Sequence, residues 1–266
     1  MNDECLDIKR NNRIRKIKLT ICQIVLLTLF LFIWEMLARY EIINEFIFSS
    51  PSSIYKTLVL YIEQGLLFKN IWISIYETIL GIIIGSAGGI IIASILWYSK
   101  TLTDILRPFL NVLNALPKTA LAPIMIIWAG ASVRGIVVVA VSILIVITII
   151  STHNYFINVE EEKIKMMKSF GATKTQLFTK LIFPSNIGNI ATVVKINIGM
   201  SWIGVIVGEL LVSKEGIGYL IMYGGQIFNQ DLVMMGVFIL SIFAFIMYVI
   251  VDKLEKFIIK KRGEKK

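Results

Sequence analysis

The sequence has few of the residues from which metal and redox sites are built. Among 266 residues there is one histidine, His153, and there are two cysteines, Cys5 and Cys22. Both cysteines lie near the N-terminus, one in a polar segment and one at the edge of an apolar run, so a disulfide framework is not expected. Because no cluster of histidine, cysteine and carboxylate residues is present, we expect no metal site.

Motifs that carry catalysis are missing as well. The chain has no GxxxxGK[ST] phosphate loop, so it is not expected to bind ATP by that route. It also has no GxSxG, no HExxH and no paired catalytic carboxylates. These absences argue against an enzyme, and a membrane-embedded enzyme is the least favoured class. We therefore expect a protein that acts by binding, by moving, or by both.

Apolar residues dominate instead. They make up 56% of the chain, and the mean hydropathy is +0.78, well above that of a soluble domain. A helix needs roughly 20 apolar residues to cross the hydrocarbon core of a bilayer, and the chain contains several runs of that length. The net charge of +9 gathers at both ends, as expected for cytoplasmic segments of a membrane protein. A nucleic-acid partner is therefore not expected.

The hydropathy pattern predicts an all-α polytopic membrane protein with about six transmembrane helices. The expected spans are residues 19–37, 73–97, 107–129, 135–156, 187–211 and 232–251. We expect a membrane domain over residues 19–256 between basic tails at 1–18 and 257–266. The first span has no small-residue cleavage site and is expected to stay uncleaved. The bias of lysine and arginine places both termini inside.

Glycine and proline mark special features of these spans. Gly81, Gly85, Gly88 and Gly89 form a small-residue face that allows close helix packing in the second span. Three prolines, Pro108, Pro117 and Pro123, interrupt the third span. Residues 49–53, with Pro51 in the first turn, are expected to open an amphipathic helix that lies flat on the outer leaflet.

The longest polar interlude in the chain is residues 158–188. Lysines alternate there with apolar side chains at helical spacing until Gly171 interrupts the pattern. Thr173 then begins T-x-x-Q, a capping box that Gln176 completes, and Pro184 disfavours helix at Phe183. We predict two short helices hinged at Gly171 that expose lysines and apolar side chains. An ordinary basic loop between membrane helices is the alternative reading.

At these residues the chain resembles the permease subunit of bacterial ABC importers, whose cytoplasmic loop has the form E-A-A-x3-G-x9-I-x-L-P. Gly171 takes the place of the glycine, and residues 181–184 (LIFP) stand where I-x-L-P is expected. Lys165, Met166 and Met167 replace E-A-A. The sequences WEMLAR, FSSPSSIY and EGIGYL, with the proline-rich third span, are similar to the nitrate/sulfonate/taurine-type branch. The resemblance covers residues 34–256.

The resemblance implies a fold like that of type I ABC importer permeases, in a bacterial plasma membrane with both termini cytoplasmic. It further implies a homodimer surrounded by lipid, a separate ATPase that holds ATP and Mg, and an extracytoplasmic binding protein that delivers a small polar solute. That solute would be similar to a sulfonate, nitrate, taurine or a vitamin precursor. The ATPase contacts would lie in a coupling loop at 158–184, on Lys165, Met166, Met167, Phe170, Gly171, Ala172, Thr173, Gln176, Leu181 and Pro184.

Other polar and small residues are candidates for the transport path. On the fifth span we consider Gly199, Ser201, Trp202 and Glu209. In the outer loop, which is expected to be re-entrant, we consider Gly216, Gly218 and Tyr219. Lys195 is expected to extend toward the cytoplasmic surface.

The main alternative function is an ion-coupled secondary transporter, which would need acidic residues at mid-depth and paired half-repeats. Glu77 and Glu209 are expected near span ends, and no half-repeat is visible. Both observations count against that alternative. The family often has arginine at the position of Glu77, for which the sequence offers no explanation.

Overall fold

Helices joined by short links make up the part of the chain that the computed structural model describes, which is the backbone of residues 2–261 and the side chains of Arg15 and of residues 18–256. Five long helices contain an apolar stretch that can cross a membrane. They are α1 (Asn2–Arg39), α4 (Leu66–Tyr98), α7 (Val133–Ile157), α11 (Ile187–Val212) and α13 (Gln230–Lys261). The side chains of the expected basic tails lie almost wholly outside the described residues.

The third predicted span is not a single helix. Residues 107–129 are divided between α5 (Lys100–Ala115) and α6 (Ala122–Ala129), which are separated at residues 116–121. Leu116 is extended, with φ −66° and ψ 138°, because the ring of Pro117 disfavours helical geometry at the preceding residue. Pro108 is tolerated inside α5, and Pro123 sits in the first turn of α6. In place of about six spanning helices, the described chain therefore has five, and the shorter helices α5 and α6 together replace the sixth.

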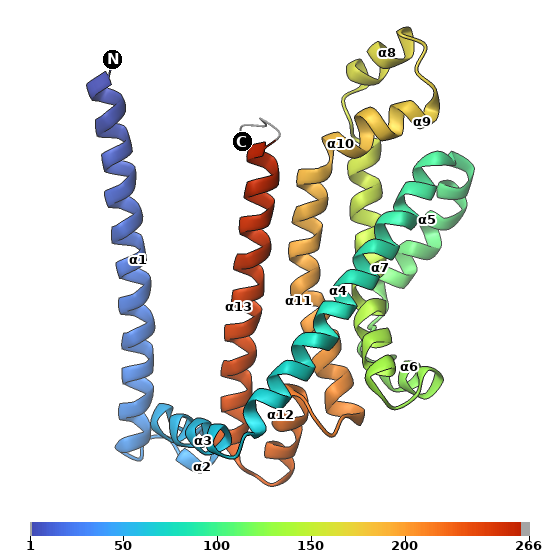
Figure 1. Cartoon of the computed structure of the whole chain (residues 1–266). Helices are drawn as coiled ribbons and strands as arrows, with labels where there is room; N and C mark the ends of the chain where they lie inside the picture. The colour runs from blue at the N-terminus through green and yellow to red at the C-terminus, as the bar shows by residue number, and fades with distance from the viewer. Residues whose placement is uncertain (1, 262–266) are drawn as a thin grey trace.

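The two-helix return still brings the chain back across the bundle. Consequently the start of α1, the end of α13 and the segment between α7 and α11 all lie at one end of the molecule (Figure 1). The opposite end carries α2 (Glu45–Phe48), α3 (Pro51–Glu63) and α12 (Ile217–Gln226). This arrangement matches the even number of crossings expected from the sequence.

Helix α3 begins as its sequence predicts. Ser50 caps it by accepting a hydrogen bond from the Ser53 backbone amide, and Pro51 occupies the first turn. The Ser53 and Ser50 hydroxyls also donate to Glu45 Oε1 and thereby hold the pKa of Glu45 below its usual value. The helix lies across the end of the bundle (Figure 1) and buries Ile54 against it.

Glycines bring α4 into close contact with α7 and α11. A Cβ at Gly81 would lie 2.6 Å from Ser201 Oγ of α11, and one at Gly89 would lie 2.6 Å from Thr148 Cβ of α7. Between them, a Cβ at Gly85 would overlap the Leu144 side chain, whereas Gly88 leaves an ordinary 3.5 Å contact. The small-residue face predicted from the sequence is therefore the seam along which these three helices pack.

A buried hydrogen-bond network crosses the same seam. The Asn197 amide of α11 donates to Ser86 Oγ of α4 and to Thr148 Oγ1 of α7, both at 2.9 Å. All three side chains are buried. An amide in hydrocarbon must find partners, because an unpaired polar group there is costly. The network therefore fixes the register of α4, α7 and α11.

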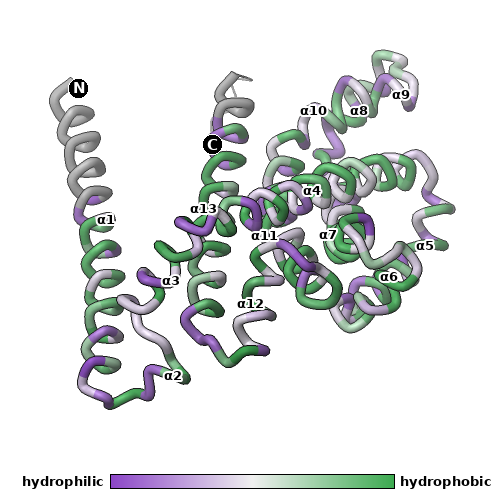
Figure 2. The backbone as a smooth tube through the Cα atoms, turned by 60° about the horizontal axis from the view of Figure 1, so that its bottom comes forward, coloured by the Kyte–Doolittle hydropathy of each residue, from purple (hydrophilic) through white to green (hydrophobic). Residues whose placement is uncertain are grey.

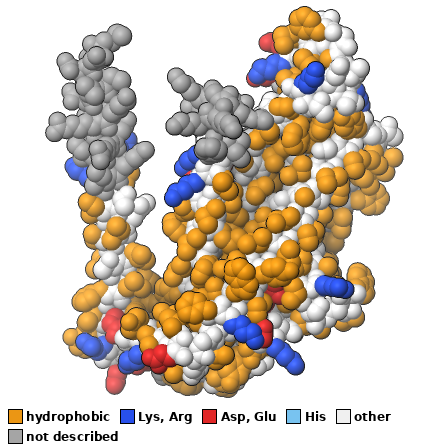
Figure 3. Space-filling view, viewed as in Figure 1, with side chains coloured by type: hydrophobic (Ala, Val, Ile, Leu, Met, Phe, Trp, Pro, Cys, Tyr) orange, Lys and Arg blue, Asp and Glu red, His pale blue; other side chains and the backbone are white. Residues whose placement is uncertain are grey.

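Helix α1 stands apart from this bundle. It packs on α3 and, through Trp34 stacked on Phe238, on α13, and its apolar side chains are mostly exposed (Figures 1 and 2). Apolar side chains also cover the middle of the visible face of α4 and α13, while charged side chains gather toward the two ends (Figure 3). This distribution is that of a protein whose middle faces lipid.

The close packing of α7 against α11 predicts that alanine substitutions at two glycines of α11 have different effects on stability. A Cβ at Gly204 would fall on the Ala140 backbone, whereas nothing lies within 4 Å of a Cβ at Gly199. We expect Gly204→Ala to destabilise the protein by about 1–3 kcal/mol through overpacking, and Gly199→Ala to be neutral. The melting temperature of each variant is measured in detergent, with the loss of folded protein on heating monitored by size-exclusion chromatography. Equal melting temperatures for the two variants would contradict the packing.

Candidate functional site

The polar segment between α7 and α11 folds into the two short helices that the sequence predicts. Helix α8 (Glu161–Ser169) ends in a Schellman motif, in which the Gly171 amide donates to Lys168 O and the Ala172 amide donates to Met167 O. Gly171 has φ +74°, a left-handed conformation that favours glycine. The chain therefore turns sharply at the predicted hinge.

Helix α9 (Lys174–Leu177) begins with the predicted capping box. The Thr173 hydroxyl accepts from the Gln176 amide at 3.3 Å, and the Gln176 side chain accepts from the Thr173 amide at 2.8 Å. These reciprocal bonds satisfy two backbone donors at the helix start. The angle between α8 and α9 is thus fixed on both sides of Gly171.

The prediction that Pro184 disfavours helix at Phe183 is wrong. Residues 178–182 form a π-turn that continues into α10 (Phe183–Ser185), and the Phe183 amide bonds to Phe178 O, five residues back. A π-turn widens the helix by one residue, and Pro184 falls in the first turn of α10, where its missing N–H costs little. The segment therefore runs on almost continuously into α11.

Aromatic packing attaches this segment to the ends of the membrane helices. Phe178 contacts the rings of Trp97 and Tyr98 at the end of α4, with centroids 5.1 and 5.2 Å away, and Phe156 at the end of α7, 5.4 Å away. The Lys174 ammonium donates to Tyr98 O at 2.7 Å and lies over the Trp97 ring. Movement of the segment must therefore carry α4 and α7 with it.

The remaining face of the segment is open. Phe170 is 80% exposed and Met166 is 55% exposed, although both are apolar. Met167 and Leu181, by contrast, pack against the buried cluster around Phe178. Exposed apolar side chains surrounded by lysines are typical of a surface that binds another protein. Of the predicted coupling residues, Met166 and Phe170 are therefore the large apolar ones whose side chains are exposed.

A second polar cluster lies at the opposite end of the bundle, around Glu209. This carboxylate accepts hydrogen bonds from the Ser74 hydroxyl at 2.6 Å and from the Gly218 amide at 2.5 Å. Ser74 Oγ in turn accepts from the Ile217 amide, and Asn70 Oδ1 accepts from the Gly216 amide. The first amides of α12 are therefore satisfied by side chains of α4 and α11.

The two predicted outer-loop glycines are required by this cluster. Gly216 has φ +111°, and a Cβ there would overlap the Glu209 carboxyl group. A Cβ at Gly218 would lie 2.8 Å from Glu209 Oε2. Tyr219 points elsewhere and stacks on Tyr223, with centroids 5.9 Å apart. Gly216 and Gly218 therefore allow α12 to pack directly on Glu209.

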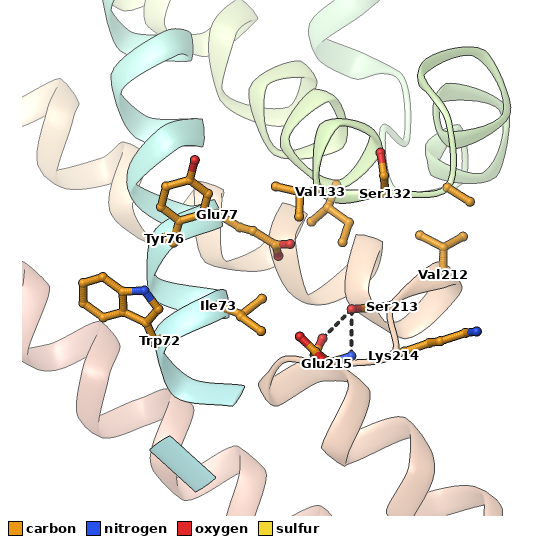
Figure 4. A pocket seen from close by; sticks show the side chains of 12 residues that line it. Trp72, Ile73, Tyr76, Glu77, Ser132, Val133, Val212, Ser213, Lys214 and Glu215 are labelled. Carbon is orange, nitrogen blue, oxygen red and sulfur yellow. Dashed lines mark hydrogen bonds between the residues drawn. The ribbon is translucent and has the colours of Figure 1, made fainter. Parts of the chain in front are cut away.

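Beside this cluster is a cavity of about 620 Å³. Its walls come from α4, from the link between α6 and α7, and from the link between α11 and α12 (Figure 4). Glu77 reaches into it from α4. Sequence analysis placed Glu77 near a span end but gave it no role, and it did not identify Ser74 or Asn70, because their partners are more than 130 residues away in the chain.

The other predicted path residues lie away from this cavity. Ser201 is buried and donates to Thr78 O of α4 at 3.0 Å. Trp202 is 3% exposed in the core, whereas Gly199 faces the open side of α11. Their assignment to a transport path stays a prediction.

Lys195 forms ion pairs near the end of α13, so the expectation that it extends toward the cytoplasmic surface stays a prediction. Its ammonium group pairs with Asp252, at 3.1 Å, and with Glu255, both on α13. Glu255 is itself buried and also accepts from the Thr192 hydroxyl. A buried carboxylate such as that of Glu255 is stable when a lysine pairs with it. These contacts join α11 to α13.

Comparison with known proteins identifies the family. Residues 85–260 match the family model described as the binding-protein-dependent transport system inner membrane component. The chain belongs to this family. It is therefore a transport permease, as its coupling-loop motif implies, and not an ion-coupled secondary transporter.

Individual relatives agree with this assignment. The permease is 28% identical to a putative aliphatic sulfonates transport permease protein of Bacillus subtilis, over 87% of this chain and 84% of that protein. It is 26% identical to a formylaminopyrimidine transport permease protein of Halalkalibacterium halodurans, over 86% of this chain and 91% of that protein. The inward-facing MetNI methionine ABC transporter shares its fold, with a TM-score of 0.63 over 73% of this chain and 96% of that chain, at 15% identity.

The bridging role of Ser74 in the permease gives a direct prediction. Ser74→Ala removes a donor to Glu209 and an acceptor for the Ile217 amide, leaving buried polar groups unpaired at a cost of about 1–3 kcal/mol. We expect a lower melting temperature and faster proteolysis at Lys214 in the adjacent link. Ser241→Ala is the control, because that exposed hydroxyl bonds only within its own helix. If both variants behave like wild type, Ser74 does not hold α12.

Proposed function

We propose that this permease forms, as a pair of identical copies in a bacterial plasma membrane, the path for a small polar solute, and that a separate ATPase drives it through the segment α8–α10. The observation that carries the proposal is the attachment of that segment to α4 and α7. Its outer face exposes Met166 and Phe170, while its inner face packs through Phe178 on Trp97 and Phe156. Such a segment can receive a push on one side and transmit it on the other.

The exposed face fits a protein groove in its chemistry. Methionine has a flexible, polarisable side chain that fills irregular apolar surfaces, and Phe170 offers a large ring with few internal degrees of freedom. Lysines 163, 165 and 168 on α8 surround these apolar residues. Charges at the rim of an interface speed association with an acidic partner more than they add affinity. ATP and Mg would be held by the partner ATPase.

The direction of transport follows from the two ends of the bundle. The end that carries α8–α10 also carries the start of α1 and the end of α13 (Figure 1), and we assign it to the cytoplasm because lysine and arginine concentrate there in the sequence. The opposite end, with α3, α12 and the 620 Å³ cavity, would then receive the solute from a binding protein. The relatives are named for the transport of sulfonates and of a formylaminopyrimidine, so we expect the solute of this permease to be of similar size.

The proposal is tested by a tryptophan at Gly171. Nothing lies within 4 Å of a Cβ at Gly171, so a bulky side chain there meets no neighbour and projects from the surface that the ATPase would grip, although the φ of +74° strains any side chain. We expect Gly171→Trp to remain in the membrane, to lose co-purification of the ATPase and to abolish ATP-driven uptake. The measurement is a pull-down from detergent, with uptake assayed in the same cells.

Gly65→Trp is the matched control for backbone strain. Gly65 has a similar φ of +70° and equally open surroundings, but it lies between α3 and α4 at the other end of the bundle. ATPase binding that survives in Gly65→Trp and is lost in Gly171→Trp supports the coupling role. Normal binding and uptake in Gly171→Trp would refute it.

A further inference from the structure

A small polar cavity lies between α5 and the C-terminal part of α7, at the end of the bundle that carries α8–α10 (Figure 1). It has a volume of about 120 Å³. Its polar walls are formed by Thr103, Arg107 and Asn111 of α5 and by His153 and Asn154 of α7. None of the described residues that line it is acidic. The cavity therefore offers the charge of Arg107 and several hydrogen-bond donors to a group that enters it.

Three of these polar side chains have no partner within the described protein. Arg107 forms no ion pair or hydrogen bond with a described residue, although Asp104 lies three positions before it. The side-chain amides of Asn111 and Asn154 are likewise unbonded within the described part of the chain. All three side chains are exposed. One guanidinium and two amides, from two different helices, are therefore available to a ligand.

The rest of the lining is already bonded or is apolar. His153 is buried, and its Nε2 lies 3.4 Å from the hydroxyl of Thr103, which is buried as well. The remaining lining residues are apolar: Leu96, Leu110, Ile149 and Ile150. Leu113, one turn further along α5, is exposed and continues this apolar surface toward the middle of the membrane. The cavity thus has a polar part and an apolar flank.

The depth of the cavity matches that of lipid headgroups. His153 is four residues before the end of α7, which is roughly 6 Å at 1.5 Å per residue. Helix α7 has 25 residues and is therefore roughly 37 Å long, whereas the hydrocarbon core of a bilayer is about 30 Å thick. The cavity consequently lies at the edge of that core, where the phosphate groups of lipids meet a membrane protein.

The size of the cavity distinguishes between two sources of an anionic ligand. A guanidinium with neighbouring amides binds the phosphate of a lipid and the anionic group of a free solute by the same contacts. Pockets for whole small molecules have volumes of about 300–1,000 Å³, so a cavity of about 120 Å³ suits one charged group rather than a whole solute. A lipid meets this limit, because its phosphate enters the cavity while its acyl chains stay in the bilayer. Basic pockets between membrane helices bind such headgroups.

We propose that the cavity between α5 and α7 binds the phosphate group of an anionic membrane lipid such as phosphatidylglycerol. Arg107 supplies charge-assisted hydrogen bonds, and Asn111 and Asn154 donate from the two helices on either side. The acyl chains follow the apolar flank at Leu110 and Leu113. The bound lipid bridges α5 to α7 and so holds the first half of the broken third span against the bundle. This site goes beyond the proposed transport function and does not depend on it.

Lipid binding to the purified permease tests the site. Native mass spectrometry measures the affinity for phosphatidylglycerol and for phosphatidylcholine with the same acyl chains. We expect a preference for phosphatidylglycerol, and we expect Arg107→Gln to reduce that affinity by about tenfold, because a hydrogen bond to a charged group is lost. Asn154→Ala should also weaken binding, since the site spans two helices. Both variants should keep the melting temperature of lipid-free wild type, because neither side chain is bonded within the described protein.

Two further arginine variants make the binding measurement specific. Arg134→Gln removes an exposed positive charge at the other end of α7 and should leave the affinity for phosphatidylglycerol unchanged. Arg107→Lys keeps the charge at the site and should retain part of the affinity. Wild-type affinity in Arg107→Gln, or an equal loss in Arg134→Gln, would overturn the proposal.

Competition distinguishes a lipid from a free anion at the same site. Neither inorganic phosphate nor ethanesulfonate should displace phosphatidylglycerol more than sodium chloride does at equal ionic strength, which controls for screening. Stronger displacement by either anion would assign the cavity to a free anion and overturn the lipid assignment. Since the assay uses neither ATP nor a partner protein, its failure is separable from loss of ATPase binding in Gly171→Trp, which tests the proposed function.

Discussion

The close packing of α4 against α7 and α11 is the constraint on which the rest of the structure depends. Gly81, Gly85 and Gly89 remove the side chains that would hold these helices apart, and Asn197 then ties all three together through Ser86 and Thr148. Without a hydrophobic force between helices in lipid, such close contacts and internal hydrogen bonds supply the association energy. Helix α4 thereby becomes a rigid rod that runs from one polar end of the protein to the other.

This rod connects the two functional regions of the permease. At its C-terminal end Trp97 and Tyr98 hold the α8–α10 segment through Phe178. Near its N-terminal end Asn70 and Ser74 hold the start of α12, and Glu77 reaches into the outer cavity. Under the proposed function, a tilt that an ATPase imposes on α8–α10 would therefore change the geometry of the cavity without any need for a chain of small side-chain shifts. Rigid-body rocking of packed helices is a recognised class of such motions.

Local sequence patterns predicted local structure well. They could not predict which residues distant in the chain contact each other. The capping box at Thr173, the hinge at Gly171 and the start of α3 at Pro51 depend on residues within a few positions of one another, and all are present. The partners of Lys195 and the surroundings of Glu77 depend on helices packed from remote parts of the chain. Pro184 misled for another reason, because a π-turn, which has no simple sequence signature, accommodates it. The broken third span shows that Pro117 ends α5 by keeping Leu116 extended.

The isolation of α1 divides the permease into two mechanical parts. Among the described side chains, this helix contacts the rest of the chain near its C-terminal end, where it packs on α3 and Trp34 stacks on Phe238 of α13 (Figure 1). A force applied at α8–α10 passes directly into α4, α7 and α11, but it reaches α1 only after crossing the whole thickness of the bundle. Helix α1 can therefore remain anchored in the surrounding bilayer while the transporting core moves beside it, so the cycle need not drag the full perimeter of the protein through lipid.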